Sequence, residues 1–443
     1  MLSLFRNRDY SRLFAAQVVA LVGSGLLTVA LGLLAYDFAG DRAGLVLGTA
    51  YTIKMVAYVG LSPVAQALVQ RLPRKAVLIG ADLIRAAVAL CLPFVSDHWQ
   101  VYGLIFVLQA ASATFTPAYQ AVLPDVLPEE RDYTRALSLS RMAYDLENLT
   151  SPALAGLLLT VMSYHWLFLG TVAGFVGSAL LVTVSVIPVL SGTAAARPFR
   201  ERLSRGLRIY LATPRLRGLL ALNLAAASVG AFVLVNTVVL VRGDCGAGET
   251  GLAIAMAAFG AGSMAAALVL PRLLDRLSDR PVMMAGASGL ILVGLLMGVL
   301  IWLDGLPGWG VFLLVWAVTG FLYSTILTPS GRLLRRSAHA EDRPAVFAAQ
   351  FALSHACWLL TYPLAGWAGN AAGMGPALML LAGVAALGLA LAARLWPAGL
   401  PEAPEHEHPD LPEDHPHLRA HGGRRHAHAF VIDDEHHAWP TQG

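Results

Sequence analysis

Four polar residues interrupt a long apolar stretch of the chain, at Arg141, Asp145, Glu147 and Asn148. Arg141, Asp145 and Asn148 follow the i, i+4, i+7 spacing of one helical face, so we expect Arg141 to pair with Asp145. Glu147 points about 200° away from Asp145 around the helix axis, out of reach of that arginine. Such a carboxylate takes a partner from another helix, a proton or a bound cation. We therefore predict that a proton and a cation compete for Glu147, and a structural ion network is the alternative.

The tail of the chain, residues 399–443, holds nine of its thirteen histidines. The repeats "HEH", "HPH" and "HAH" place two imidazoles on one side of an extended chain. Imidazole and carboxylate groups suit divalent ions such as Ni, Co, Zn and Cu. We predict metal ligands at His406, His408, His415, His417, His426, His428, His436 and His437.

The same tail is too polar to form a core, so we expect it to be disordered and to collect metal in the cytoplasm. A charged tail without a metal function is the alternative. Its apolar segment "AFVI" (429–432) and Trp439 are expected to dock on the rest of the protein or on the membrane surface.

The elements that position these residues follow from the composition, which is 57% hydrophobic and 13% charged. Such a chain is a polytopic, all-α membrane protein. Crossing a bilayer takes about 20 helical residues. Windows of that length predict twelve transmembrane helices, at residues 11–37, 44–69, 76–95, 100–122, 136–161, 166–190, 217–241, 251–271, 282–303, 309–330, 346–369 and 375–396.

Composition and motifs also exclude several classes of function. The net charge of +3 is small and its basic residues are scattered, which argues against nucleic-acid binding. Cys91, Cys245 and Cys357 have no spacing typical of a disulfide framework or a thiolate metal site. Phosphate-binding and hydrolase motifs do not occur, so we expect neither an enzyme nor a cofactor. We expect the first apolar run to stay as a helix, because it lacks a signal-peptide cleavage site.

Basic residues fall on one side of the membrane if the predicted spans alternate. By the positive-inside rule both termini are cytoplasmic, and we expect a multi-pass protein of a bacterial cytoplasmic (inner) membrane. The clusters that define this side are Arg6 to Arg12, Arg71 to Lys75, Arg131 to Arg135, Arg197 to Arg217, Arg272 to Arg280 and Arg332 to Arg343.

A basic linker at residues 191–215 divides the chain into a six-helix bundle at 1–190 and another at 216–398. The two bundles resemble each other in sequence. A shift of 212 residues aligns Thr116-Pro117 with Thr328-Pro329, Glu129 with Glu341, and Arg131 with Arg343. An ordered series at one offset indicates an internal repeat, which is typical of secondary transporters with a substrate site between the repeats.

Over residues 5–398 the chain resembles the major facilitator superfamily. The segment "PVAQALVQRLPRKAVL" (63–78), followed by Asp82 and Arg85, is similar to that family's signature loop. Gln66 and Gln70 stand where the family has a glycine and an aspartate, so the sequence departs from the motif there. The resemblance implies two six-helix bundles that expose a midplane site alternately to each side.

A narrower resemblance is carried by "SRMAYDLENLTSPALAG", "FALSHACWLLTYPLAGWAG" and the histidine-rich tail, which look like the nickel-resistance permeases. It implies proton-coupled export of a divalent metal, with Glu147 as the coupling carboxylate supported by Asp145 and Arg141. The family fold also implies that Lys54 approaches His355 across the bundle interface. It further implies a cavity lined by Gln109, Asn223, Ser228 and Asn236. Packing hydrogen bonds are the alternative for His355 and for these four residues.

The expected partners are therefore a divalent metal ion or a small molecule, protons and the lipid bilayer, with the protein acting as a monomer. The first alternative is an exporter of drugs or organic metabolites from the same superfamily. An alternative of another class is a membrane metal sensor that transports nothing and uses the tail as its receptor.

Overall fold

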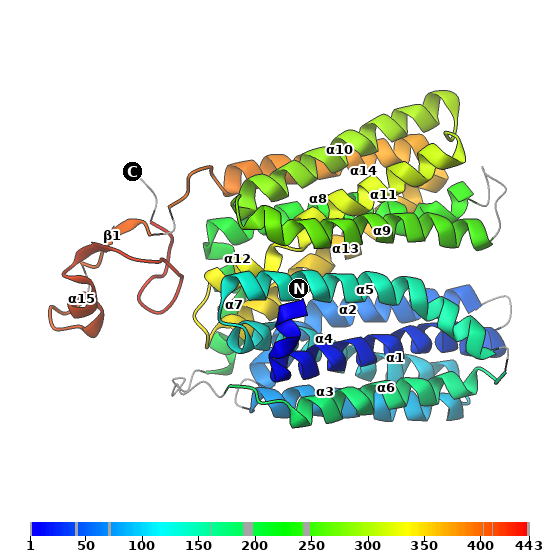
Figure 1. Ribbon diagram of the computed structural model, residues 1–443, viewed down its shortest axis with the longest axis horizontal. Coiled ribbons are helices and arrows are strands. Elements are labelled where there is room, and N and C mark those ends of the chain that lie inside the picture. The colour runs from blue at the N-terminus through cyan, green and yellow to red at the C-terminus, as the bar shows by residue number, and fades with distance from the viewer. Residues whose placement is uncertain are drawn as a thin grey trace.

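The computed structural model describes residues 2–39, 43–69, 72–159, 161–188, 198–241, 249–401, 403–409 and 411–440. Twelve long helices run side by side through this part of the chain (Figure 1), as the sequence predicts. The N-terminal half contains α1 (Arg8–Ala39), α2 (Ala43–Val69), α3 (Arg74–Cys91), α4 (His98–Val126), α5 (Glu130–Leu159) and α6 (His165–Val184). The C-terminal half contains α8 (Pro214–Val239), α9 (Glu249–Leu274), α10 (Asp279–Asp304), α11 (Trp309–Leu327), α13 (Arg343–Ala372) and α14 (Met374–Leu395).

Shorter elements join the long helices. The 3-10 helices η1 (Leu2–Arg6) and η3 (Leu92–Phe94) flank α1 and α3, and α12 (Ser330–Arg336) follows α11. Pro329 separates α11 from α12, because a proline removes a helical hydrogen bond and crowds the preceding turn. Gly305 and Gly373, with φ of 83° and 88°, end α10 and α13 and let the chain reverse.

Eleven helices of the described chain are long and apolar enough to cross a membrane. The remaining long helix, α5, carries Arg141, Asp145 and Glu147. A helix with so many charges is stable in a membrane only where neighbouring helices surround it. Its packing against α1 on one side and α9 on the other meets that condition.

Close helix contacts hold each half together. In the N-terminal half α1 packs on α6, where Gly23 and Gly174 bring the two backbones together. In the C-terminal half α9 packs on α11, and a Cβ on Gly262 would collide with the carbonyl of Ala317. The two halves meet through α2 with α13, α5 with α9, and α4 with α13. The interface is therefore built by helices from both repeats.

The predicted linker contains a helix, α7 (Phe199–Ala212), which packs against α13. Arg205 on α7 is fully buried and its Nη2 lies 2.8 Å from Asp342 Oδ2. Residues 191–197 of the linker lie outside the described part of the chain.

The tail differs from our expectation of disorder. It contains a two-stranded antiparallel sheet, β1 (Glu405–Glu407) with β2 (Arg425–Ala427), and a short helix, α15 (Pro416–His421). Phe430, Ile432 and Trp439 are buried in the same hydrophobic cluster as Leu334 of α12. The predicted apolar segment does dock, and this burial supplies the stabilisation that the polar composition alone lacks.

Figure 1 shows the tail beyond one end of the helices, beside α7 and α12. The N-terminus of α1 lies toward that same end. We refer to it below as the tail end of the bundle.

Candidate functional site

A cavity of about 700 Å³ lies between the two halves. Helices α1 to α5 form its N-terminal wall, and α8, α12 and α13 form most of its C-terminal wall. Its surface combines hydroxyl and amide groups with many aromatic rings, contributed by Tyr58, Phe115, Tyr119, Tyr144, Phe347, Phe351 and Trp358. A cavity of this size and lining suits a small organic molecule.

Five residues predicted as site residues line this cavity together: Lys54, Arg141, Glu147, Asn223 and His355. Glu147 is half-buried near the middle of α5. The side chains of Asp145 and Asn148 lie outside the described residues, so the predicted pairing of Arg141 with Asp145 stays a prediction.

Arg141 makes a contact across the interface that the sequence did not predict. Its Nε donates a hydrogen bond to Ser263 Oγ of α9 at 3.2 Å. Its guanidinium also lies 5.0 Å from the ring centroid of Tyr323 on α11. Both partners belong to the C-terminal half, so Arg141 joins the two halves beside the cavity.

Lys54 and His355 lie at the same part of the cavity, and Tyr58 contacts both. The Lys54 ammonium is 5.6 Å from the Tyr58 ring centroid, and the rings of Tyr58 and His355 are 4.8 Å apart. His355 Nδ1 lies 2.7 Å from Phe351 O, one helical turn away. This bond holds the ring and leaves Nε2 as the atom that can meet a ligand.

Three of the four residues expected to line the cavity do not do so. Gln109 is half-buried on α4, away from the cavity wall. Ser228 donates a hydrogen bond to Leu224 O in its own helix, and Asn236 donates one to Ala365 O of α13 at 3.1 Å. The alternative of hydrogen bonds between packed helices therefore describes Asn236, whereas the bond of Ser228 stays within α8.

Gln17 of α1 is a cavity residue that sequence reasoning missed. Its Oε1 accepts a hydrogen bond from Ser140 Oγ at 2.9 Å and lies 3.3 Å from Tyr119 OH. A single amide within the first predicted span was the available signal. Arg85, noted only as part of a motif, also lines the cavity and pairs with the fully buried Asp82.

Ion pairs between the halves close the tail end below this cavity. Asp125 of α4 accepts from Arg74 of α3, and Arg343 Nη1 of α13 reaches its Oδ1 at 3.0 Å. Arg74 Nη2 also donates to Ala340 O at 2.9 Å. Asp125 is only 5% exposed, so this pair is well shielded from water. We call Arg74, Asp125 and Arg343 the gate triad.

A second group of charges crosses the interface beside the triad. Glu130 Oε1 of α5 lies 3.0 Å from Arg332 Nη2 and 2.5 Å from Arg336 Nη2, both on α12. Asp279 of α10 binds the same two arginines at 3.2 and 3.3 Å. Tyr133 OH adds a hydrogen bond to Gly331 O. In this conformation, ion pairs and hydrogen bonds therefore hold the two halves together at the tail end.

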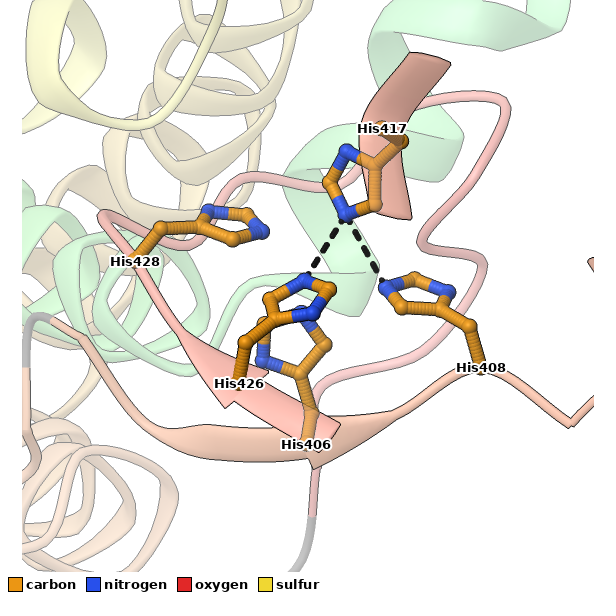
Figure 2. A group of neighbouring side chains, drawn as sticks. All are labelled: His406, His408, His417, His426 and His428. Carbon is orange, nitrogen blue, oxygen red and sulfur yellow. Dashed lines mark hydrogen bonds between the residues drawn. The ribbon is translucent and has the colours of Figure 1, made fainter. Parts of the chain in front are cut away.

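The structure brings five of the predicted tail histidines into one cluster, His406, His408, His417, His426 and His428 (Figure 2). One ring nitrogen of each lies within 4.8 Å of those of the others. His406 and His426 are cross-strand partners in the β1–β2 ribbon. Because strand side chains alternate with a period of two, His408 and His428 fall on the same face, and His417 from α15 covers it. We call these five residues the histidine cluster.

The remaining predicted tail ligands lie around that cluster. His436 Nε2 is 3.2 Å from His406 Nε2. His415 lies at the start of α15, where its Nδ1 accepts from His417 N. His437 is exposed.

Comparisons with known proteins agree with this architecture. The family model described as Major Facilitator Superfamily matches residues 13–243 and 219–432. A variant of the E. coli fucose:proton symporter FucP has a TM-score of 0.68 at 17% identity, with 87% of this chain and 98% of that chain covered. A bacterial homologue of the iron transporter ferroportin has a TM-score of 0.66 at 15% identity, covering 88% and 98%. Likenesses at this identity show the fold.

Sequence relatives are partial or distant. Macrolide efflux protein A of Streptococcus pyogenes is 31% identical over 183 residues, which is 40% of this chain and 44% of the relative. The uncharacterized MFS-type transporter YfiS of Bacillus subtilis is 26% identical over 361 residues, covering 78% and 83%. The chain thus matches less than half of the macrolide efflux protein's length. These relatives give no support to the resemblance to nickel-resistance permeases.

A family model that covers most of the chain, together with twelve long helices in two halves, leads to one conclusion: the chain belongs to the Major Facilitator Superfamily.

Proposed function

We propose that the protein exports an organic molecule of drug size by alternating access, driven by protons that bind Glu147. The observation that carries this proposal is the cavity of about 700 Å³ with its aromatic walls. Aromatic rings offer large apolar contact area, and scattered polar groups orient a ligand. The similarity to a macrolide efflux protein supports the same class of substrate.

The cavity is less suited to a bare metal ion. Among the described side chains, three or more His, Cys, Asp or Glu residues lie close enough to share an ion in the tail, and this group is not part of the cavity lining. A metal ion that crosses the membrane needs several such ligands in the transport path. This difference favours organic cargo over the divalent metal that the tail suggested.

Glu147 is the group we assign to proton coupling. A carboxylate in the cavity, half-way along α5, can take up a proton from one side and release it to the other as the halves rock. Ionised groups at this depth are costly and are typically retained for function. Lys54 and Arg141, in the same wall, would then respond to the charge of Glu147 through the cavity.

The proposed orientation places the tail end in the cytoplasm. Arg74 bonds to Ala340, which follows α12, Arg205 bonds to Asp434 of the tail, and Arg335 belongs to α12, so basic residues gather at this end as the positive-inside rule requires. The protein would then be a bacterial inner-membrane transporter with both termini cytoplasmic, and the described conformation would be closed toward the cytoplasm. A monomer suffices, since one chain forms the whole cavity.

Divalent metal export is the second candidate, and the histidine cluster is the observation that favours it. In that case the tail would concentrate the ion near the cytoplasmic entrance. A sensor without transport is the third.

Uptake into inverted membrane vesicles separates these candidates. A macrolide and Ni²⁺ would each be offered with and without a proton gradient. We expect gradient-driven macrolide uptake that Glu147→Gln abolishes, with Asp304→Asn, an exposed carboxylate at the end of α10, as the matched control. Normal gradient-driven uptake by Glu147→Gln would refute the coupling role. Uptake of Ni²⁺ alone would replace organic cargo by metal, and no uptake at all would favour the sensor.

A further inference from the structure

Hydrogen bonds fix the orientation of the rings in the histidine cluster. His417 Nδ1 lies 2.8 Å from Glu435 Oε2, and His426 Nδ1 lies 2.7 Å from Gly423 O. An acceptor beside Nδ1 places the ring proton there, so in the neutral ring the lone pair is on Nε2. Metal-binding histidines are usually held in this way, by a carboxylate or carbonyl at the second nitrogen.

The Nε2 atoms oriented by these bonds meet at one point. His417 Nε2 lies 3.1 Å from His408 Nε2 and 3.0 Å from His426 Nε2 (Figure 2). If His408 carried its proton on Nε2, it could donate a hydrogen bond to His417 Nε2. The lone pairs of His417 Nε2 and His426 Nε2 would still face each other and repel. Two nitrogen ligands of a tetrahedral ion, with bonds of about 2.0–2.1 Å, lie about 3.3 Å apart. A single cation therefore satisfies all three nitrogens.

We propose that His408, His417 and His426 bind one borderline divalent cation, of the Zn²⁺, Co²⁺ or Ni²⁺ class. We further propose that this ion stabilises the contacts that connect the tail with the gate triad. Imidazole nitrogens select this class of ion over Mg²⁺ and Ca²⁺. His428, on the same ribbon face, supplies the fourth ligand of a tetrahedral ion.

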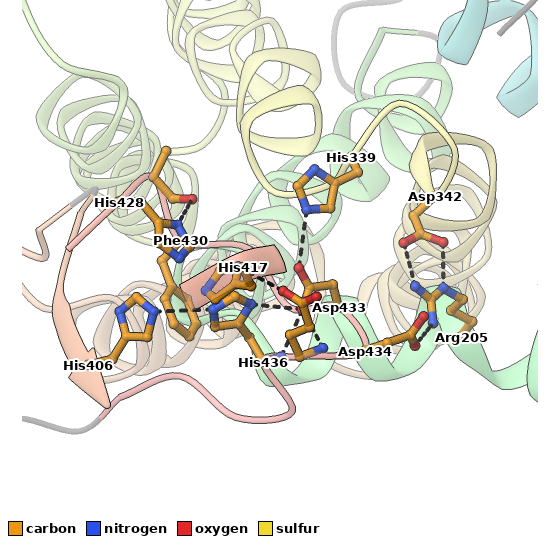
Figure 3. A network of polar contacts seen from close by, with 12 residues as sticks. Arg205, His339, Asp342, His406, His417, His428, Phe430, Asp433, Asp434 and His436 are labelled. Carbon is orange, nitrogen blue, oxygen red and sulfur yellow. Dashed lines mark hydrogen bonds and ion pairs between the residues drawn. The ribbon is translucent and has the colours of Figure 1, made fainter. Parts of the chain in front are cut away.

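A line of polar contacts leads from His406, at the edge of the histidine cluster, to His339 (Figure 3). His406, the cross-strand partner of His426, lies 3.2 Å through its Nε2 from His436 Nε2. His436 Nδ1 lies 2.8 Å from Asp433 Oδ1, and Asp433 Oδ2 lies 3.2 Å from His339 Nε2.

His339 belongs to the loop at residues 337–342, between α12 and α13. Ala340 O of this loop accepts from Arg74 of the gate triad. Asp342, at the other end of the loop, binds Arg205 of α7, which also binds Asp434 of the tail at 2.6 Å. An ion that rigidifies the tail therefore acts on the loop from both ends, and stabilises the conformation in which the tail end is closed.

The histidine cluster is separate from the transport path, since none of its members lines the central cavity. The ion is accordingly a regulator of the transporter. This inference does not depend on the identity of the exported molecule, because both the site and its link to the gate lie outside the cavity.

Metal titration of the purified full-length protein tests the site. Co²⁺ reports tetrahedral coordination through its visible absorption, and Zn²⁺ and Ni²⁺ compete for it. We expect one ion per chain, and loss of that ion in the triple variant His408→Ala, His417→Ala and His426→Ala. The variant His437→Ala removes an exposed tail histidine outside the cluster and should bind as the wild type does. Equal weakening in both variants would mean that the tail binds metal only through its histidine content, and would overturn the site.

Hydrogen–deuterium exchange of the same protein tests the link. Zn²⁺ should protect the tail and also the 337–342 loop. Asp433→Asn keeps every proposed ligand and the Arg205 contacts but weakens the contact to His339, so it should bind Zn²⁺ and protect the loop less than the wild type does. Equal loop protection in Asp433→Asn, or none in the wild type, would overturn the link. Neither result bears on Glu147, so these tests fail or succeed independently of the vesicle assay.

Discussion

Arg343 of the C-terminal half lies 3.0 Å from Asp125 of the N-terminal half, and Arg131 lies 3.2 Å from Asp275 in the opposite direction. The two arginines occupy equivalent positions in the internal repeat, 212 residues apart. Each half therefore uses the same position to reach a carboxylate on the other half. The pairs differ in burial, since the Arg131 side chain is 65% exposed and that of Arg343 is 18% exposed.

Asp125→Asn should weaken closure of the tail end. An exposed ion pair is worth at most about 1 kcal/mol, and breaking a buried one costs about 3–5 kcal/mol, so we expect about 2 kcal/mol here. That is roughly a 30-fold change in the ratio of closed to open states. The measurement is labelling of Ser354→Cys in the cavity by a membrane-impermeant thiol reagent, from each side of the membrane, with the native cysteines replaced by serine.

Arg131→Gln is the matched control, because the exposed pair with Asp275 should contribute little. Asp125→Asn should increase labelling from the tail side, whereas Arg131→Gln should leave it unchanged. If Ser354→Cys is labelled equally from the tail side in both variants, burial of an ion pair does not determine how strongly it holds the tail end closed.

Trp358→Ala should weaken binding of the transported molecule while leaving the turnover rate largely intact. Trp358 lines the cavity, and loss of one aromatic contact with a ligand costs roughly 1–2 kcal/mol, or about tenfold in KM. Trp367 on the same helix is 65% exposed, so Trp367→Ala is the control. Macrolide uptake kinetics in vesicles measure both variants, and a KM that changes only in Trp367→Ala would contradict the assigned cavity.

Gly262→Ala should destabilise the C-terminal half. A Cβ at this position would collide with the carbonyl of Ala317, so α9 and α11 must move apart, at a cost of about 1–3 kcal/mol. Gly383 of α14 has open space around its Cβ position, and Gly383→Ala should be neutral or slightly stabilising. Thermal unfolding in detergent compares the two, and equal melting temperatures would show that the helices are not in backbone contact.

Tail docking should weaken as the pH rises above neutrality. The hydrogen bond to Asp433, against the opposing effect of burial, raises the pKa of His339 above its ordinary value of 6.5, and Asp342 and Glu341 add to the rise. Because the pKa is raised in the docked state, the His339–Asp433 contact stabilises docking fully below pH 6.5. This stabilisation is lost as the pH rises through the raised pKa of His339. The mobility of a spin label at His437→Cys, recorded from pH 6 to pH 9 with chelator present, should therefore increase.

His339→Gln removes this titration and should give the same mobility throughout that range. A pH response that survives in His339→Gln would assign the effect to another group.

The sequence determined the twelve helices, their division into two halves and the apolar anchor of the tail. Each of these follows from the sequence itself. Long apolar runs predict the spans, and matches at an offset of 212 residues predict the repeat. Residues 429–432 and Trp439 are more apolar than a linker, so they predict the anchor. The sequence also identified Lys54, Arg141, Glu147, Asn223 and His355, because a polar group in an apolar segment is visible in one dimension.

Which of those polar groups share a cavity, and which serve packing, depends on how the helices pack in three dimensions. Asn223 and Asn236 have the same chemistry on the same helix, yet the first lines the cavity and the second bonds to Ala365. The tail shows the same limit, since nine histidines in a polar segment predicted disorder, whereas strand pairing and anchoring by Phe430 form one compact cluster. Contacts between distant segments depend on how whole helices and strands pack, and no local pattern encodes that packing.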